Sequence, residues 1–182
     1  MKHLYIVLFL LSGMFVSVAQ NKLVPTDAGS KVHFVIKNFA INTGGDFKGL
    51  QGSIIFNPND LQHTSFDVSV EASTIDTDSE MRDEHLKEDE YFDVTRFPKI
   101  SIKSTQIVHS SKAGRYYFFG TLTIKGISKA IEFGFSATPK TEGLLFEGEF
   151  NINRRDFNVG EKSISLNDNV KISLSIMGKN AQ

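Results

Sequence analysis

The sequence contains no cysteine, no tryptophan and only four prolines among its 182 residues. Without cysteine, the chain has neither a disulfide framework nor a thiolate that could act as nucleophile or metal ligand. It also lacks an excess of charge of either sign, because 20 basic side chains are balanced by 21 acidic ones. Nucleic-acid binding depends on basic side chains that neutralise phosphates, so we predict no nucleic-acid partner.

The first twenty residues have the pattern of a secretory signal. Lys2 and His3 precede an apolar run, and the small residues Ser17 and Ala19 provide a cleavage site. A transmembrane anchor is the alternative, but the run is shorter than the roughly 20 apolar residues that cross a bilayer. We therefore predict that residues 1–19 are a removable signal peptide. The mature protein is then periplasmic or secreted, without stable insertion in a membrane.

After this segment, apolar and polar residues alternate with a period of two, which is typical of β-strands with one buried face. The clearest example is the run around Phe66, Val68 and Val70, and a Gly-containing loop is expected at residues 42–46. Alternating segments occur around residues 32–36, 54–56, 66–72, 100–102, 118–124, 131–135, 144–152 and 170–176. With no repeat or linker between them, they predict a single all-β domain over residues 22–179 with eight antiparallel strands.

Eight strands that each bury one face can form a sandwich or a closed barrel. A closed barrel of this size has an interior that side chains fill or that holds one small ligand. Gly120 and Gly148 interrupt the aromatic faces of two strands, next to Phe118 and Phe146. Two interpretations stay open: the missing side chains leave room for a ligand, or the glycines are bends that close the barrel.

The alternation stops at residues 78–92, whose first ten residues contain neither Gly nor Pro and can form a helix. Thr77 or Asp78 is expected as the N-cap, and charges spaced i,i+4 can pair on the solvent face, as Asp78 with Arg82 and Asp83 with Lys87. We predict a short helical insertion that caps one end of the barrel. The residues of this cap motif are Arg82, Asp83, His85, Leu86 and Phe92.

The same insertion contains the residues that most suggest chemistry. Arg82, Asp83 and His85 are close together, but no Ser or Cys nucleophile is paired with them, so we expect them to fix the cap through charged hydrogen bonds. The acidic run resembles the start of a calcium loop, yet Met81 stands where that loop needs Gly and Lys87 where it needs Glu. The histidines are scattered, without metal-ligand spacing. We predict no metal, no cofactor and no enzymatic activity.

Ten short blocks, spread in order along nearly the whole chain, form a recognisable set. They are residues 30–34, 45–47, 52–56, 73–77, 82–86, 92–93, 97–100, 120–129, 154–160 and 168–170. Together these blocks resemble the YceI-like family, whose members are exported lipocalin-like barrels that bind long isoprenoids or other amphipathic lipids. The resemblance implies that fold and that class of ligand here, and it is compatible with a homodimer. One departure is Asn38-Phe39, where the family tends to show His-Leu.

The phenylalanine-rich inner face is where a lipid tail is expected. Each methylene moved out of water gains about 0.8 kcal/mol, so an apolar tunnel binds a tail without any reacting residue. The candidates for the tunnel wall are Phe34, Ile36, Ile54, Phe56, Phe118, Leu122, Phe133, Phe135, Phe146 and Phe150. The alternative is that these side chains form a filled core.

We therefore predict a non-catalytic carrier of a long-chain isoprenoid, an isoprenoid quinone or a similar amphipathic lipid. Two alternatives stay open, a small outer-membrane barrel of eight strands and an enzyme that acts on a lipid or quinone head group. The acidic insertion and the polar C-terminus argue against the outer-membrane barrel. The lack of a recognisable set of catalytic residues argues against the enzyme. Four basic residues can contact an anionic head group or form a solvated rim: Lys125, Lys129, Arg154 and Arg155.

Overall fold

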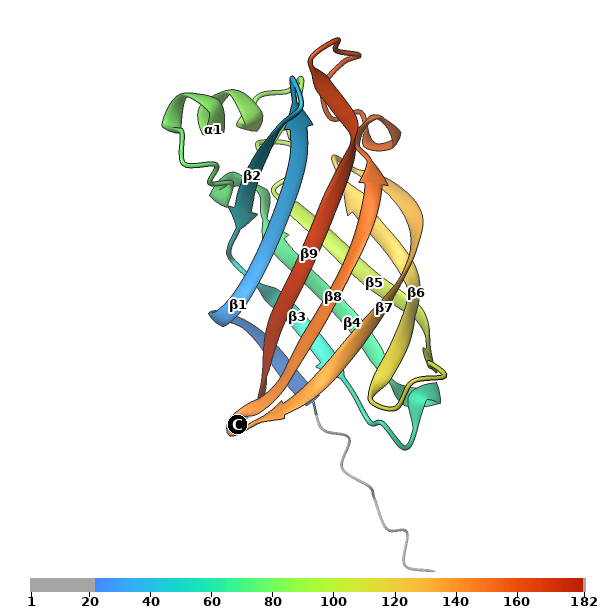
Figure 1. The fold of residues 1–182 in the computed structure, drawn as a ribbon. Helices are drawn as coiled ribbons and strands as arrows, with labels where there is room; N and C mark the ends of the chain where they lie inside the picture. Colours follow the sequence, from blue (N-terminus) through green and yellow to red (C-terminus); the bar gives the residue numbers. More distant parts are fainter. Residues whose placement is uncertain (1–21, 182) are drawn as a thin grey trace, which may run out of the picture.

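The computed structural model describes residues 22–181, which form nine strands and one short α-helix arranged as a barrel (Figure 1). The strands are β1 (Lys22–Asn38), β2 (Ile41–Phe47), β3 (Gln51–Ile55), β4 (Ser65–Glu71), β5 (Lys99–His109), β6 (Arg115–Ile124), β7 (Ile127–Lys140), β8 (Gly143–Asn153) and β9 (Leu166–Asn180). The helices are α1 (Glu80–Lys87) and the 3₁₀ helices η1 (Leu61–His63), η2 (Ala72–Thr74) and η3 (Arg154–Phe157). The predicted signal peptide, residues 1–19, lies outside the described residues. No helix within residues 22–181 combines the length and apolar character needed to cross a bilayer.

Eight of the nine strands close into an antiparallel barrel in the order β1-β3-β4-β5-β6-β7-β8-β9, because β9 also pairs with β1. The expected eight-stranded all-β barrel is confirmed. Strand β1 bends at a register shift between Thr26 and Lys31, where the Ser30 hydroxyl accepts a 2.7 Å bond from the Met177 amide. Beyond this bend β1 exchanges its neighbour β3 for β2. We call the end of the barrel where β1 finishes and α1 lies the helix end (Figure 1).

The ninth strand corrects one expectation, because residues 42–46 are part of β2 and do not form a loop. The glycines in this segment are explained by ring packing across the β1–β2 pair. A Cβ added to Gly44 would lie 3.0 Å from the His33 ring, and one added to Gly45 would lie 2.6 Å from the Phe34 ring. Glycine within a strand often marks such a close approach, which local sequence alone does not distinguish from a turn.

The helical insertion is present but shorter than the expected 78–92, since α1 ends at Lys87 and a series of turns follows. The N-cap position belongs to Ser79, not to Thr77 or Asp78. The expected i,i+4 ion pairs are also wrong. Lys87 pairs with Glu84 at 2.7 Å, because the neighbouring carboxylate of Asp83 is bound to Thr77.

Aromatic side chains fill the half of the barrel remote from α1. Phe56 and Phe66 lie edge-on to the Phe146 ring at centroid distances of 5.3 and 5.2 Å. Above them Phe118, Phe133 and Phe150 form a stack across β6, β7 and β8, with centroid distances of 4.9 and 4.7 Å. This half is therefore a packed core, in which aromatic pairs add to the stabilisation from apolar burial.

The glycines on the aromatic faces do not leave room for a ligand, so that interpretation is wrong. A Cβ on Gly148 would lie 2.9 Å from the Phe133 ring, and one on Gly120 would collide with the Lys103 carbonyl oxygen and lie 2.6 Å from the Phe118 ring. The space is thus taken by rings and backbone of the protein itself. Gly120 also lies opposite Ser104, where the register of β5 and β6 shifts, as expected for a bend that helps to close the barrel.

Candidate ligand-binding site

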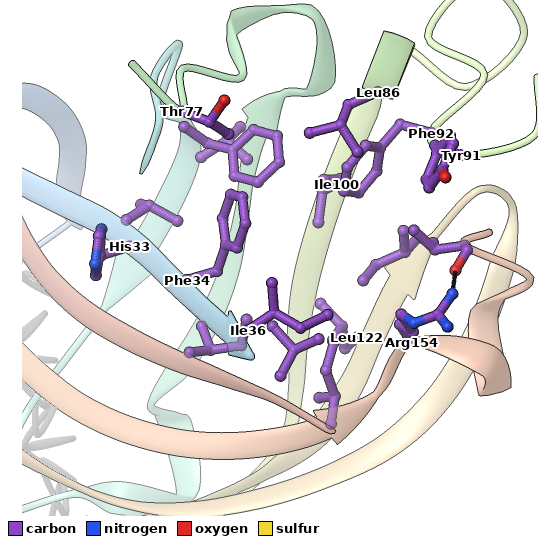
Figure 2. Close-up of a pocket in the computed structure, with 18 of the residues that line it drawn as sticks. His33, Phe34, Ile36, Thr77, Leu86, Tyr91, Phe92, Ile100, Leu122 and Arg154 are labelled. Atoms are coloured by element: carbon purple, nitrogen blue, oxygen red, sulfur yellow. Dashed lines mark hydrogen bonds between the residues drawn. The ribbon is translucent and has the colours of Figure 1, made fainter. Parts of the chain in front are cut away.

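A cavity of about 310 Å³ occupies the helix end of the barrel. Its wall consists of inward-facing apolar side chains from six of the barrel strands, and β2 and the segment that carries α1 complete it. Figure 2 shows Phe34 and Ile36 from β1, Ile100 from β5 and Leu122 from β6 around the same space. Apolar concave sites of this size are the usual binding sites of small molecules.

The structure divides the ten predicted tunnel residues into two groups. Phe34, Ile36, Leu122 and Phe150 line the large cavity. A second cavity of only about 40 Å³ is lined by Ile54, Phe118, Phe133, Phe135 and Phe146, while Phe56 lies in the packed core and lines neither. The first group therefore faces space that a ligand can occupy, and the second group belongs to the aromatic half.

Phe150 stands at the boundary between these two groups. It lines the large cavity with one face and stacks on Phe133 with the other, and Phe133 in turn stacks on Phe118. The stack forms a floor, which we call the aromatic floor (Phe118, Phe133 and Phe150). This floor lies between the large cavity and the 40 Å³ space in the aromatic half.

The cap closes the opposite side of the cavity through Leu86 and Phe92, which face the barrel strands in Figure 2. The Phe92 ring stands edge-on to Phe47 of β2 at 5.5 Å, and Phe47 in turn contacts Phe34 at 5.7 Å. A continuous row of aromatic rings thus joins the cap to β1, and all three rings line the cavity.

Two residues of the cap motif hold α1 to the barrel through Thr77, whose side chain is buried. The Asp83 carboxylate accepts hydrogen bonds from both the amide and the hydroxyl of Thr77, the former at 2.9 Å. Arg82 donates to the Thr77 hydroxyl at 2.8 Å and to its carbonyl oxygen. These are charge-assisted bonds, about twice as strong as neutral ones, so Arg82 and Asp83 have a structural role.

His85, the remaining polar residue of the cap motif, makes only exposed contacts. Its Nδ1 lies 3.2 Å from a carboxylate oxygen of Glu88, and its ring packs 4.9 Å from that of Tyr91. His85 and Tyr91 both line the cavity, and burial, with a smaller effect of Glu90, raises the pKa of the Tyr91 hydroxyl. A tyrosine hydroxyl is protonated at neutral pH even at its ordinary pKa, so this hydroxyl can donate to an oxygen of a ligand.

The other side of the cap is fastened by basic residues. Lys125, in the β6–β7 turn, donates to the carbonyl oxygens of Glu90 and Asn158 at 3.1 and 2.9 Å. Gly160 donates its amide to the same Glu90 carbonyl at 3.0 Å. The segment after α1 is therefore tied to both the β6–β7 turn and the chain that follows η3.

Arg154 does not belong to a solvated rim, which corrects that interpretation, since only 4% of it is exposed. Its guanidinium donates to the carbonyl oxygens of Val159, Glu161 and Asn167 and to the Asp168 carboxylate, at 2.8–3.1 Å. These bonds use four of its five N–H groups, so Arg154 mainly shapes the wall of the cavity. Figure 2 shows it at the edge of this space with one of these bonds.

Sequence reasoning missed the roles of Thr77, Tyr91 and Arg154. The partners of Arg154 are carbonyl groups, which leave no trace in a sequence, and its carboxylate partner is fourteen residues away. Thr77 was considered only as a helix cap, although its spacing to Arg82 and Asp83 permits contact with both. Within residues 22–181, no group of three or more His, Cys, Asp or Glu side chains is arranged to hold a metal ion.

Comparison with known proteins agrees with this geometry. The YceI-like domain profile matches residues 24–177. A UPF0312 protein of Yersinia enterocolitica is 26% identical over 144 residues, which cover 76% of this chain and 74% of that protein. The crystal structure of BcnA from Burkholderia cenocepacia, 25% identical, covers 82% of this chain and 96% of its own with a TM-score of 0.76. A polyisoprenoid-binding domain from Saccharophagus degradans, 11% identical, shares the fold with a TM-score of 0.71 over 89% of this chain and 99% of that domain.

Proposed function

This chain belongs to the YceI-like family, and we propose that it is a non-catalytic binding protein that encloses the apolar tail of an amphipathic lipid in its barrel. The ligand we propose is an isoprenoid, an isoprenoid quinone or a lipid of similar shape. The observation that carries this proposal is the 310 Å³ cavity at the helix end, walled by apolar strand residues and covered by Leu86 and Phe92. The polyisoprenoid-binding domain with the same fold supports the same class of ligand.

The tail lies between the cap and the aromatic floor in this proposal. Burial of each methylene there contributes about 0.8 kcal/mol, against which the ordering of the flexible tail must be subtracted. Two polar groups that line the site, the Tyr91 hydroxyl and the His85 ring, lie at the cap. The head group is therefore expected near α1, with the tail directed toward Phe150.

The distribution of polarity favours a binding protein over an outer-membrane barrel. A membrane barrel needs a band of apolar side chains on its outer surface and a polar lumen. Here the barrel interior contains the apolar cluster, including Phe118, Leu122 and Phe135. Outward positions between them carry side chains such as Lys103 and Glu149, which form surface ion pairs.

The polar side chains of the cap favour binding over catalysis. Arg82 and Asp83 are engaged with Thr77, and the His85 ring pairs with Glu88. An enzyme would instead need a base positioned beside a nucleophile or an activated water. If purified protein turned over a quinone or lipid head group, and Asp83→Asn or His85→Ala removed turnover while binding persisted, the binding-only assignment would be wrong.

The proposed location is outside the cytoplasm, in the periplasm or secreted, with residues 1–19 removed as a signal peptide. The support is the pattern of Lys2, an apolar run and small residues before Gln20. Mass spectrometry of the N-terminus of protein from the periplasmic fraction tests this directly. An intact N-terminal Met, or recovery only with the cytoplasm, contradicts the proposal.

The ligand is tested by native mass spectrometry of protein purified from its own source, followed by titration of the delipidated protein with prenols and quinones in detergent. A pocket-filling variant, Ile152→Trp, is expected to abolish binding, because Ile152 lines the cavity. The matched control is Asn151→Trp, which places the same side chain on the outer face of β8 and should bind normally. Equal binding by both variants would show that the tail does not occupy this cavity.

A further inference from the structure

Large apolar side chains are exposed at the helix end more than elsewhere. Among residues 22–181, six large hydrophobic side chains are exposed, and four of them lie at this end: Phe39, Ile41, Met81 and Ile164. Phe39 and Ile41, on the β1–β2 hairpin, are 75% and 70% exposed, and Ile164, in the loop before β9, is fully exposed. Single exposed apolar residues are common on soluble proteins, but a group on one end marks an interaction site.

The hairpin presents its aromatic residue through an unfavourable turn. Asn38 pairs with Ile41, so the connection consists of only Phe39 and Ala40, with φ angles of +47° and +65°. Two-residue hairpin turns with both φ angles positive strongly prefer Asn-Gly, because side chains with a Cβ are strained there. Neither the strained turn nor the exposure of the Phe39 side chain to water stabilises the fold.

The hairpin tip and the loop before β9 lie side by side. The Phe39 amide donates to the Ser165 carbonyl at 2.8 Å, and Asn38 pairs with Leu166. Ile164 is therefore close to Phe39 although the two are far apart in sequence. Figure 1 shows both segments projecting at the helix end. Phe39, Ile41 and Ile164 together form a protruding apolar tip.

This tip is part of the rim of the cavity. Asn38 and Leu166 both line the cavity, and they are the chain neighbours of Phe39 and Ser165. Exposed lysines flank the tip, with Lys37 on the hairpin and Lys162 in the loop beside the exposed acid Glu161, whereas other exposed acids of this end, such as Glu80, Glu84 and Glu88, belong to α1 and the turn after it. Apolar residues flanked by lysines are typical of segments that settle into the boundary between lipid head groups and acyl chains.

We propose that the apolar tip, formed by Phe39, Ile41 and Ile164, docks the mouth of the cavity onto the surface of a lipid bilayer. Phe39, Ile41 and Ile164 enter the interface while Lys37 and Lys162 meet lipid phosphates. The tip consists of only three exposed apolar side chains, whereas a stable protein partner usually requires a buried area of about 1,000 Å² or more. Docking at the mouth lets an apolar tail move between bilayer and barrel without crossing water, although docking itself does not depend on which ligand the cavity holds.

Fluorescence provides a direct test because the chain has no tryptophan. Phe39→Trp introduces one indole at the tip, and vesicles of phosphatidylcholine with phosphatidylglycerol should shift its emission to shorter wavelength. The control, Tyr117→Trp, places an indole at an exposed position on β6 near the opposite end of the barrel. Its emission should not change. No shift for Phe39→Trp, or equal shifts for both variants, would overturn the proposal.

A second variant separates docking from folding. Phe39→Asn with Ala40→Gly removes the aromatic residue and supplies the pair that this turn prefers, so the unfolding temperature should rise. Binding to the same vesicles in a flotation assay should fall by about tenfold or more. Tyr117→Thr serves as the control and should float like the unmodified protein. Unchanged flotation of the hairpin variant would contradict the proposal.

Two further measurements distinguish this proposal from others. If sedimentation equilibrium shows a dimer that the hairpin variant abolishes, the tip contacts a second copy of the chain and the bilayer assignment is wrong. Titration with prenols in detergent tests the proposed ligand separately. Vesicle docking without prenol binding would reject the proposed ligand alone, and prenol binding without vesicle docking would reject the docking tip alone.

Discussion

Replacing Phe150 by alanine should lengthen the cavity, because this ring closes it against the aromatic half. The ring is buried and stacks on Phe133 at 4.7 Å, while its other side lines the 310 Å³ cavity. Its removal opens space equal to roughly four or five methylene groups, about one isoprene unit, less whatever the neighbours recover by relaxing. It also brings the cavity closer to the 40 Å³ space beyond the floor.

The assay is a titration of delipidated protein with a series of saturated and prenyl alcohols of increasing length. In the unmodified protein, affinity should increase about fourfold for each added methylene until the tail reaches the aromatic floor, and then level off. In Phe150→Ala the plateau should move to tails that are longer by about one isoprene unit. The deletion should also lower the free energy of unfolding by about 3–5 kcal/mol.

The matched control is Phe56→Ala, which deletes the same ring from the packed core, where Phe56 contacts Tyr116 and Phe146. Its cost in stability should be similar, but it lines neither cavity, so its plateau should coincide with that of the unmodified protein. A plateau that stays in place in Phe150→Ala, or that moves equally in both variants, would refute the idea that the aromatic floor limits the tail.

Three further variants test the cap and its supports. Thr77→Val removes the hydroxyl that Arg82 and Asp83 share, so ligand dissociation measured by stopped flow should accelerate about tenfold with the barrel still folded; an unchanged rate would mean that α1 does not control exit. Arg154→Met leaves three carbonyl groups without their donor and should cost at least about 3 kcal/mol in urea unfolding; a smaller loss would contradict this. A hydrogen bond from Arg96 lowers the pKa of Asp93, so this carboxylate stabilises the fold above its unfolded pKa near 3.8 and the contribution disappears as the pH falls below that value. Asp93→Asn should reduce the acid dependence of the unfolding midpoint, and a parallel pH profile would exclude this role.

The closed β-barrel could be predicted because the alternation of apolar and polar residues reports which face of a strand is buried. The run around Phe66 and Val68 and the run after Gly143 were both identified in this way. The same reasoning failed at residues 42–46, where Gly44 and Gly45 read as a turn although they pair with β1. Glycine is needed at these two positions because the rings of His33 and Phe34, from the neighbouring strand β1, leave no space for a Cβ.

The candidate site could be predicted only in part. Leu86 and Phe92 were expected in the cap, and they line the cavity. The role of Arg154 could not be foreseen, because three of its four acceptors are backbone carbonyls brought together by the chain after η3. The exposure of Phe39 could not be predicted from the sequence either. Its position in a two-residue hairpin turn with positive φ angles is one that the sequence Phe-Ala does not favour.

The sequence by itself determined the strands, their inner faces and the helical interruption, because these depend on periodicity and local propensity. Only the tertiary structure decided which inner residues face a cavity and which form the core. The alternation of apolar and polar residues predicts that Phe146 and Phe150 point inward, but it does not predict their height along the barrel axis. That height depends on strand tilt and register, which place Phe150 beneath the cavity and Phe146 among the rings of the core.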